Sequence, residues 1–292
     1  MTLHRPYPSL IGPPGQVVRL TPQDASWDWT GLRVVRVGPA LSQTLETGDS
    51  ECFVLPLAGS VAAEVTSSAG RSKFDLTGRE GVFAGPTDFA YVGRDSTLTL
   101  TSDAPAEIAL PSARCIERRE PRYGEVYGVP VEERGAGQAL RHVRNFGVPG
   151  VWDHAEKLIA CEVVTPPGNW SSYPPHKHDA SAPCPVVNEE IYYYRIAGRD
   201  QVTPSRDGFG FHRTYTGPEH LRVGLAPLDE TLEVRDHDVV LVPYGYHGPC
   251  MAAPDYPMYY LNVMAGPGAE RAMAFCDDPA HAWIRDTWQG SK

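Results

Sequence analysis

Two histidines separated by one residue, His176 and His178, form the most informative pattern in this sequence. On a β-strand, alternate side chains project from the same face, so both imidazoles would point one way and Lys177 the other. Two imidazoles that converge on one point are typical ligands of a divalent transition metal. We therefore interpret this pair as half of a metal site.

A carboxylate and a third histidine could complete that site. Glu190 begins the next apolar run after a loop rich in Pro, Ala and Ser, and His247 ends a later run, DVVLVPYGYH. Three histidines and one glutamate leave one or two coordination positions open for water or substrate, which is typical of a catalytic metal. The sequence thus predicts a catalytic metal held by His176, His178, Glu190 and His247.

Glu189 is the alternative to Glu190, because the phase of the strand after the loop is unknown. Glu190 precedes Gly198 by the same spacing at which Glu51 precedes Gly59, in the similar segments EIYYYRIAG and ECFVLPLAG. This shared spacing favours Glu190 as the metal ligand.

Four further residues are candidates for lining the cavity or for contact with a substrate. An inward Glu190 would put Tyr192 and Tyr194 on the same inward face, where they line a cavity or only pack in the core. Arg213 lies on an expected strand, and its rigid fork suits a carboxylate. Tyr246 lies beside a proposed ligand and could donate a proton. Structural hydrogen bonding is the alternative interpretation for each of them.

Short strands must position these residues, because strand signals dominate the chain. Runs rich in Val, Leu, Phe, Tyr and Thr end at Gly, Pro, Asp or Asn, a pattern typical of β-sandwiches and barrels. Helical character is expected only near Ala269–Phe275 and in the C-terminal tail. The predicted strands are Leu32–Val37, Cys52–Leu57, Ser60–Val65, Thr97–Thr101, Leu158–Val164, Ile191–Ile196, Phe211–Tyr215, Val239–Pro243 and Met258–Met264.

The chain is expected to form two β domains. Charged residues, Pro and Gly interrupt the strand rhythm at Glu117–Arg134, which suits a linker or crossover. We place the domains at residues 1–125 and 126–292. The halves also resemble each other weakly, since Gly81–Ala90 resembles Asp238–His247. That match aligns Ala90 with His247. We interpret it as an internal duplication in which only the second copy has a metal site.

Composition and charge exclude several classes of function. Hydrophobic residues make up 41% and charged residues 21% of the 292, and the net charge is -10 without any run of Lys or Arg. Such a chain repels nucleic acid and anionic membranes. No segment approaches the ~20 apolar residues of a membrane helix. The N-terminus lacks the features of a secretion signal, and the six cysteines are scattered, which predicts reduced thiols in a cytoplasmic protein.

Four segments, GNWSSYPPHKHD, EEIYYYR, GFGFHRTYT and YYLNVMAGP, resemble the 5-deoxy-glucuronate isomerase family of the cupin superfamily. The long insertion between His178 and Glu190, which common cupins lack, is part of this resemblance. The 5-keto-4-deoxyuronate isomerases are related to that family. Where relatives tend to carry Gln, this chain has His212, whose role stays open.

The resemblance implies a bicupin fold with two jelly-roll barrels and a single divalent ion, zinc or manganese first and iron as an alternative. It also makes His176, His178, Glu190 and His247 the ligands by motif. The implied reaction is an aldose–ketose isomerisation of 5-deoxy-glucuronate to 5-dehydro-2-deoxy-gluconate in myo-inositol catabolism.

This isomerisation removes a proton beside a carbonyl and returns it to the neighbouring carbon, through a metal-stabilised enediolate. A metal-bound hydroxide, Tyr246 or a second carboxylate could serve as the base, and a hydride shift is the mechanistic alternative. Arg213 is the expected partner of the substrate carboxylate. An iron-dependent cupin dioxygenase and a non-catalytic sugar-binding bicupin are the competing functions. Exposed edge strands could pair copies of the chain into a homo-oligomer.

Overall fold

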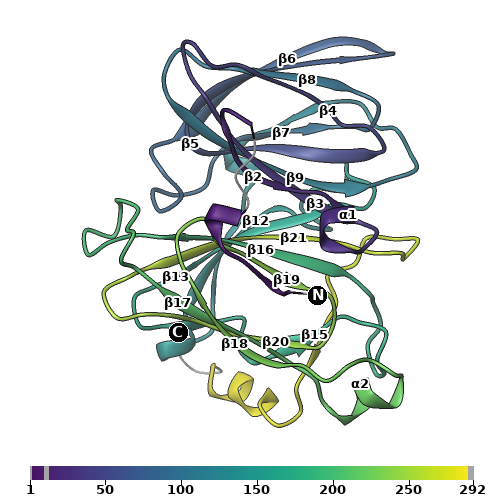
Figure 1. Ribbon diagram of the computed structural model, residues 1–292, viewed down its shortest axis with the longest axis vertical. Coiled ribbons are helices and arrows are strands. Elements are labelled where there is room, and N and C mark those ends of the chain that lie inside the picture. The colour runs from purple at the N-terminus through teal and green to yellow at the C-terminus, as the bar shows by residue number, and fades with distance from the viewer. Residues whose placement is uncertain (1, 10–12, 289–292) are drawn as a thin grey trace.

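Strands in three sheets dominate the computed structural model, which describes residues 2–9 and 13–288. The sheets form two lobes, stacked one above the other in Figure 1. The helices are short: α1 (Pro22–Ala25), α2 (Pro218–Arg222) and the 3-10 helices η1 (Tyr7–Ser9), η2 (Val126–Gly128), η3 (Gly137–Ala139) and η4 (Ala282–Trp288). The predicted all-β fold class is thereby confirmed.

The upper lobe consists of one curled nine-stranded sheet from the first part of the chain (Figure 1). Two of the predicted runs merge into a single long strand, which bulges near Pro56 and continues through Gly59. The strands are β2 (Gln16–Leu20), β3 (Thr30–Val37), β4 (Gln43–Glu46), β5 (Ser50–Ser67), β6 (Gly70–Arg79), β7 (Phe89–Val92), β8 (Thr97–Thr101), β9 (Ala106–Arg114) and β10 (Arg122–Gly124).

The lower lobe contains two sheets that enclose a common core. One has seven strands: β1 (His4–Arg5), β11 (Val131–Arg134), β12 (Arg141–Gly147), β13 (Ile159–Thr165), β16 (Glu189–Ile196), β19 (Val239–Val242) and β21 (Met258–Ala265). The other has six: β14 (Trp170–Ser171), β15 (His176–Lys177), β17 (Gly210–Tyr215), β18 (Asp229–Val234), β20 (Tyr246–Ala252) and β22 (Cys276–Asp277).

Strand β16 is buried on both faces, and its side chains point alternately into two different cores. Tyr192 and Tyr194 pack inside the lower lobe. Ile191 and Tyr193 point the opposite way, into a core that the two lobes share and to which Phe53 of the upper lobe contributes. Because full burial of one such apolar side chain contributes about 1.5–3 kcal/mol, this shared core holds the lobes together.

Strand partners change between β10 and β11, where β10 still pairs with β7 of the upper lobe and β11 pairs with β12 of the lower one. The predicted boundary at 125/126 lies between these two strands and stays a prediction. Strand β1 departs from the sequence order, since His4 and Arg5 pair with Val240 and Val239 on β19. Figure 1 accordingly shows the N-terminus in the lower lobe.

The expected match of Ala90 with His247 is wrong. Ala90 lies on β7, which pairs with β5 in the upper lobe. The strand in the corresponding place beside β16 is β19, whereas His247 belongs to β20. The two runs resemble each other in composition but occupy different positions in their barrels.

The helix expected at Ala269–Phe275 is also wrong, because that segment has no regular structure up to β22. Arg271 explains this conformation: its Nη1 donates to the Leu158 carbonyl at 2.6 Å, which ties the segment to the start of β13. The C-terminal tail does contain a helix, η4. Neither α1 nor α2 was expected, since each spans little more than one turn.

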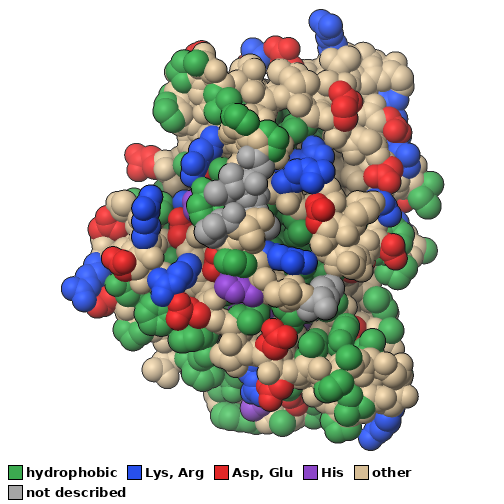
Figure 2. Space-filling model, in the orientation of Figure 1, with side chains coloured by type: hydrophobic (Ala, Val, Ile, Leu, Met, Phe, Trp, Pro, Cys, Tyr) green, Lys and Arg blue, Asp and Glu red, His purple; other side chains and the backbone are tan. Residues whose placement is uncertain are grey.

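All six cysteines are free thiols, as the sequence predicts, and four of them are buried. Within the described ranges no helix has the length and hydropathy needed to cross a membrane. On the face of the molecule in Figure 2, Lys and Arg side chains alternate with Asp and Glu.

Candidate metal centre

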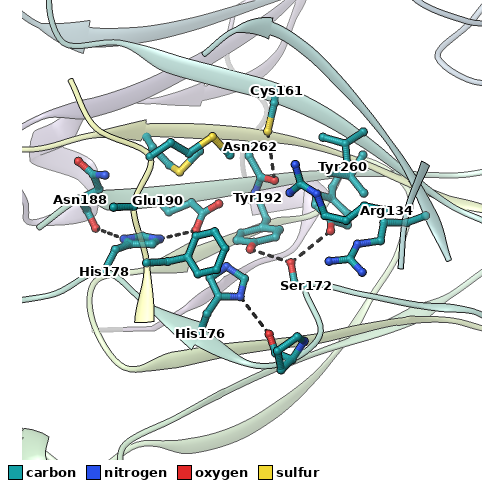
Figure 3. A pocket seen from close by; sticks show the side chains of 18 of the residues that line it. Arg134, Cys161, Ser172, His176, His178, Asn188, Glu190, Tyr192, Tyr260 and Asn262 are labelled. Atoms are coloured by element: carbon teal, nitrogen blue, oxygen red, sulfur yellow. Dashed lines mark hydrogen bonds and ion pairs between the residues drawn. The ribbon is translucent and has the colours of Figure 1, made fainter. Parts of the chain in front are cut away.

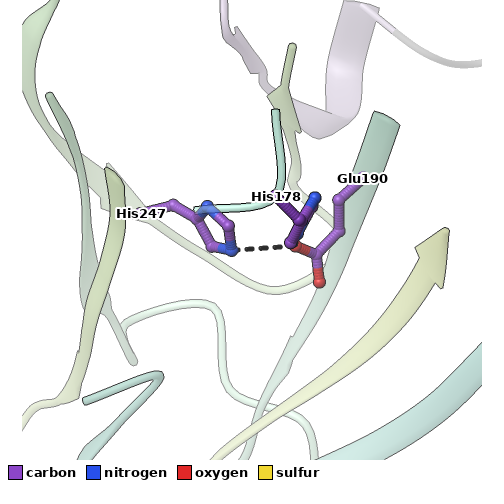
Figure 4. A group of neighbouring side chains, drawn as sticks. All are labelled: His178, Glu190 and His247. Carbon is purple, nitrogen blue, oxygen red and sulfur yellow. Dashed lines mark hydrogen bonds and ion pairs between the residues drawn. The ribbon is translucent and has the colours of Figure 1, made fainter. Parts of the chain in front are cut away.

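Three residues that are far apart in sequence converge inside the lower lobe: His178 after β15, Glu190 on β16 and His247 on β20 (Figure 4). Their ligand atoms lie within 4.8 Å of one another. Glu190 Oε2 is 3.0 Å from His178 Nε2 and 3.0 Å from His247 Nε2. All three side chains are buried. A group of this composition and spacing can hold a metal ion.

Backbone carbonyls fix the orientation of the histidine rings. The Nδ1–H of His178 donates to the Asn188 carbonyl at 2.9 Å, and that of His247 to the Gly245 carbonyl at 3.3 Å. In each neutral ring the Nε2 atom therefore carries the free lone pair and faces Glu190, whereas a protonated His178 donates its second N–H to the same carboxylate. This tautomer is the one that a metal-ligating histidine requires.

One atom of this group shows whether its residues fit a metal ion. His247 Nε2 is buried and makes no hydrogen bond within the described part of the chain, although it lies 3.0 Å from Glu190 Oε2. A buried nitrogen lone pair without a donor is costly unless something else occupies it. A divalent cation is the species that satisfies it and the neighbouring carboxylate together, so the residues fit a metal.

His176 borders this group rather than joining it. Its ring lies 4.5 Å from that of His247, directly opposite in the β15–β20 pairing, but its nitrogens are outside the 4.8 Å cluster. Its Nδ1–H donates to the Pro174 carbonyl at 3.1 Å, so Nε2 is again the free atom. Lys177, between the two histidines, points to the other side and donates to the Ser181 carbonyl at 2.7 Å.

Charge complementarity keeps Glu190 ionised. Burial alone would raise the pKa of its carboxyl, but His247 and the hydrogen bond from His178 outweigh burial and hold the pKa far below its usual range. Burial lowers the pKa of His178, but its bond to Glu190 more than compensates and the net shift is upward. The site therefore presents an anionic carboxylate to whatever ion it binds.

Asp179 joins the two loops that carry the histidines. Its Oδ2 accepts the Gly245 N–H at 2.7 Å and lies 3.1 Å from His220 Nε2. Gly245 has a φ of +95°, and a Cβ there would meet the Tyr215 carbonyl oxygen at 2.8 Å, so the turn before His247 requires glycine. The Gly245 carbonyl then accepts from His247, which links this turn to the metal group.

Glu189 faces away from the cavity that Glu190 lines. Its carboxylate accepts three backbone N–H groups of the upper lobe, from residues 28–30, at 2.7, 2.9 and 3.0 Å. Successive residues of a strand point to opposite faces, so only one of the two glutamates can reach the histidines.

A cavity of about 220 Å³ opens beside the metal group (Figure 3). Tyr192 lines it, and its hydroxyl lies 3.1 Å from Ser172 Oγ, which is 3.2 Å from the Tyr260 hydroxyl. Burial, and then the nearby Glu190 carboxylate, raise the pKa of Tyr192 well above its ordinary value. Its hydroxyl therefore stays protonated and can donate a hydrogen bond. Tyr194 points into the same core but does not line the cavity.

The structure does not bring Arg213 to the cavity. Its side chain is 40% exposed, pairs with Asp229 at 3.1 Å and stacks over Tyr215. The adjacent His212 faces inward instead, where its Nδ1 lies 2.6 Å from the Tyr194 hydroxyl. Burial, and then His247, lower the pKa of His212 to about 3, so it is neutral at physiological pH.

Tyr246 also lies outside the cavity, although it directly precedes His247. Its ring packs 5.5 Å from that of Tyr215 and 5.4 Å from that of His220, on the other side of β20. Strand alternation separates Tyr246 from the histidine next to it.

Several polar residues that line the cavity were not singled out in the sequence, among them Arg134, Arg141, Asn262 and Arg285. Arg134 belongs to the stretch interpreted as a linker, and Arg141 follows it closely. Asn262 stands within YYLNVMAGP, a segment that was noted only for its resemblance to a family. Asn262 gave a signal, since it is the one polar amide in the apolar strand MYYLNVMA, whereas the arginines lie in polar segments that gave none.

The fold and this site define a cupin-like protein of two β-barrel lobes with a buried His/Glu centre in the lower lobe. The sequence model of the KduI/IolB family matches residues 9–284, and the chain belongs to that family. The resemblance noted in the sequence is thereby confirmed. A 5-deoxy-glucuronate isomerase of Geobacillus kaustophilus is 36% identical over 281 residues, which cover 95% of this chain and 94% of that protein. The 5-deoxy-glucuronate isomerase of Bacillus subtilis strain 168 is 34% identical over 92% of each chain.

Solved structures agree with this assignment. The crystal structure of an IolB-like protein from Salmonella typhimurium LT2 superimposes with a TM-score of 0.83 at 30% identity, over 98% of this chain and all of that one. An oxalate decarboxylase of Lactobacillus farciminis has a TM-score of 0.63 at 12% identity, over 92% of this chain and 88% of that one. At that identity the likeness concerns the fold alone.

Proposed function

We propose that this protein is a metal-dependent aldose–ketose isomerase that converts 5-deoxy-glucuronate to 5-dehydro-2-deoxy-gluconate in myo-inositol catabolism. The observation that carries the proposal is the Glu190 carboxylate, held 3.0 Å from two histidine Nε2 atoms beside a cavity. Relatives named 5-deoxy-glucuronate isomerase, aligned over nearly the whole chain, support the choice of reaction and substrate.

His178, Glu190 and His247 hold the metal in this proposal, and His176 is the fourth ligand from its place beside His247. The mixed nitrogen and oxygen donor set suits zinc or manganese, with iron as the alternative. When bound, the ion supplies a Lewis acid that stabilises negative charge on the substrate oxygens during isomerisation.

Hydroxyl groups are the chain's own means of hydrogen bonding to the reacting atoms. Tyr192, Ser172 and Tyr260 form a chain of three hydroxyls along the cavity wall. Because the Tyr192 hydroxyl stays protonated, it donates to a substrate oxygen on which charge develops. Among the described residues that line the cavity, Glu190 is the only carboxylate, so a second carboxylate is not available there as the base.

We assign the reaction to a cytoplasmic enzyme with a small sugar acid as its partner, which the six free thiols support. The switch of strand partners between β10 and β11 supports the division into domains 1–125 and 126–292. Self-association through edge strands belongs to the same proposal, and light scattering on the purified protein tests it.

The experiment combines metal analysis with turnover. Purified protein is analysed for bound metal and incubated with 5-deoxy-glucuronate in deuterated water, and the product is followed by NMR. We expect turnover that disappears in stripped protein, returns with a divalent ion, and is absent in His178→Ala. Solvent deuterium in the product supports proton transfer, and its absence supports a hydride shift.

Two results would contradict the proposal. Oxygen consumption with iron bound would favour the dioxygenase function. A full metal complement and sugar-acid binding without turnover would favour the non-catalytic sugar-binding function.

A further inference from the structure

The cavity has a second charged end, opposite the metal group. Figure 3 shows Arg134 across the cavity from His178, with Tyr192 and Ser172 between them. Arg141 stands directly opposite Arg134 in the β11–β12 pairing and lines the same cavity. The positive charge at this end faces the site where the proposed reaction takes place.

The arginines at this end differ in how their charges are neutralised. Arg134 Nη2 binds Glu132 at 2.6 Å, and Arg285 binds the two carboxylate oxygens of Asp277 at 2.5 and 2.8 Å. Both have a carboxylate of their own.

Arg141 is the exception. It is only 6% exposed, and its Nη1 donates to the Ala139 carbonyl at 3.1 Å. No carboxylate among residues 2–9 and 13–288 forms an ion pair with it within 4.0 Å. Burial, together with the charges of Arg134 and Arg285, lowers its pKa to about 10, so it remains a cation at neutral pH. Its guanidinium lies over the Trp288 ring, 5.2 Å from the ring centroid, but no carboxylate of the described residues neutralises its charge. Burial of such a cation is costly, and an anionic ligand would reduce that cost.

Asn262 provides a second, independent observation. Its Nδ2 is buried and has no hydrogen-bond acceptor among the described residues. The residue lies on β21 directly opposite Tyr192 on one side and Cys161 on the other, and lines the cavity between the metal group and the arginines (Figure 3). A metal cannot satisfy an N–H donor, whereas an oxygen atom of a ligand in the cavity would accept from this amide.

We propose that Arg141 binds the carboxylate of a sugar acid and that the Asn262 amide donates to one of its oxygens, so that the reacting end lies at His178, Glu190 and His247. This inference rests on the proposed isomerase function and specifies how its substrate is oriented. It assigns to Arg141 the role that the sequence suggested for Arg213.

The metal group and Arg141 lie on well-separated strands of the same curved sheet. Glu190 and Arg141 belong to strands β16 and β12, which are separated by β21 and β13 in the seven-stranded sheet. Three strand spacings amount to about 14 Å across the curved sheet. The register adds an offset along the strands, because His142, next to Arg141, aligns through Val164 and Tyr259 with Arg195, five residues along β16 from Glu190. Both residues nevertheless line the same cavity, so the long Arg141 side chain and the metal group face one bound acid from its two ends.

Two substitutions of Arg141 and one control test this inference on the metal-loaded protein. Arg141→Met removes the charge, Arg141→Lys keeps the charge without the fork, and Arg213→Met removes an exposed arginine outside the cavity. Turnover of 5-deoxy-glucuronate is measured for each, with competitive inhibition by D-glucuronate and by D-glucose, which lacks the carboxylate. Metal content and unfolding midpoint are recorded alongside.

We expect the wild type and Arg213→Met to prefer glucuronate over glucose. In Arg141→Met, kcat/KM and glucuronate affinity should fall roughly 10- to 150-fold, the worth of a charge-assisted hydrogen bond, and the preference should disappear. Arg141→Lys should lose part of the affinity and keep the preference.

Three outcomes would overturn the inference. In the first, Arg141→Met folds, binds metal, turns over the substrate and still prefers the acid. The isomerase function would then stand, and the role of Arg141 would be excluded. If Arg141→Met does not fold, unchanged affinity in Arg141→Lys decides against the inference in the same way. If the wild type neither converts nor binds the acids, the proposed function fails and the inference fails with it.

Discussion

Glu51 and Glu189 perform the same task for opposite lobes of the molecule. Glu51, on β5 of the upper lobe, accepts the backbone N–H groups of residues 156–158 at 2.9, 2.6 and 2.7 Å, just before β13. Glu189, on β16 of the lower lobe, accepts those of residues 28–30, just before β3. Each carboxylate satisfies three consecutive donors of the other lobe, so the two lobes hold each other by a reciprocal contact.

This contact predicts a large loss of stability in Glu51→Ala. Three buried N–H groups would lose their acceptor, and hydrogen bonds to charged groups contribute about 1.5–3 kcal/mol each, so we expect the free energy of unfolding to fall by about 3 kcal/mol or more. Urea denaturation measures this change. Glu64→Ala, at an exposed position on the same strand, should change stability little. Equal effects of the two substitutions would contradict the prediction.

The neighbouring glutamates of β16 provide a sharp test of the metal site. Glu190→Gln should reduce bound metal to a small fraction of the wild-type content, because it removes the anionic ligand from a buried group. Glu189→Gln should keep the metal and lose stability instead, since its side chain binds backbone N–H groups of the other lobe. Elemental analysis of the purified variants checks both, and metal loss in Glu189→Gln alone would reverse the assignment.

Substitution of two tyrosines of β16 distinguishes a hydroxyl that acts in the cavity from one that only stabilises the core. Tyr192→Phe removes a hydroxyl that lines the cavity, and loss of one donor to a developing oxyanion costs roughly 10²-fold in kcat, with KM changed less. Tyr194→Phe removes a hydroxyl that binds His212 away from the cavity, so we expect lower stability with kcat nearly unchanged. Steady-state kinetics of both variants decide the point, and equal kcat values would exclude Tyr192 as the donor.

A buried carboxylate between the lobes predicts a loss of stability in acid. Glu162 binds Arg79 of the upper lobe and accepts from the Tyr259 hydroxyl at 2.7 Å. Burial raises the pKa of Glu162, but Arg79 and Arg144 outweigh burial and lower it from 4.5. Because the folded-state pKa is depressed, its contribution is fully present above pH 4.5 and is lost as the pH falls through the folded value.

Urea unfolding of the wild type at a series of pH values from 7 down to 3 measures this loss. Glu162→Gln has no carboxyl to titrate, so its stability should be lower at pH 7 and should change less over the same range. Parallel curves for the two proteins would show that Glu162 does not carry the acid sensitivity.

The predicted strands were accessible from the sequence because each is a short apolar run closed by turn residues, and every predicted run coincides with a strand or part of one. Polar strands such as β6, β11 and β18 have no such run and were not predicted. Which side chains of a strand point inward was harder to infer. The spacing that favoured Glu190 matched it to Glu51, yet Glu51 shares the outward face and the backbone-binding role of Glu189. The bulge near Pro56 shifts the register of β5, so equal spacing in the sequence does not mean the same face.

Residues at the far end of the cavity could not be predicted from the sequence, for a different reason. Arg141 and Asn262 come together with the metal group only because β12, β13 and β21 pair across the curved sheet. Such pairing between distant segments leaves no local pattern in the sequence. Arg213 shows the reverse case: its type suited a carboxylate, but its position on β17 directs it to solvent, where it pairs with Asp229.

Strand β1 makes the start of the chain a structural part of the lobe that contains the metal group. His4 and Arg5 cover the edge of β19, and the Tyr7 N–H donates to Asp238 at 2.9 Å. A fragment that begins at residue 126 would therefore expose a bare strand edge in the metal-binding barrel, where unpaired backbone groups promote aggregation. An affinity tag at the amino end would likewise sit on that barrel, so protein engineers should treat the two ends of this chain as belonging to the same half of the molecule.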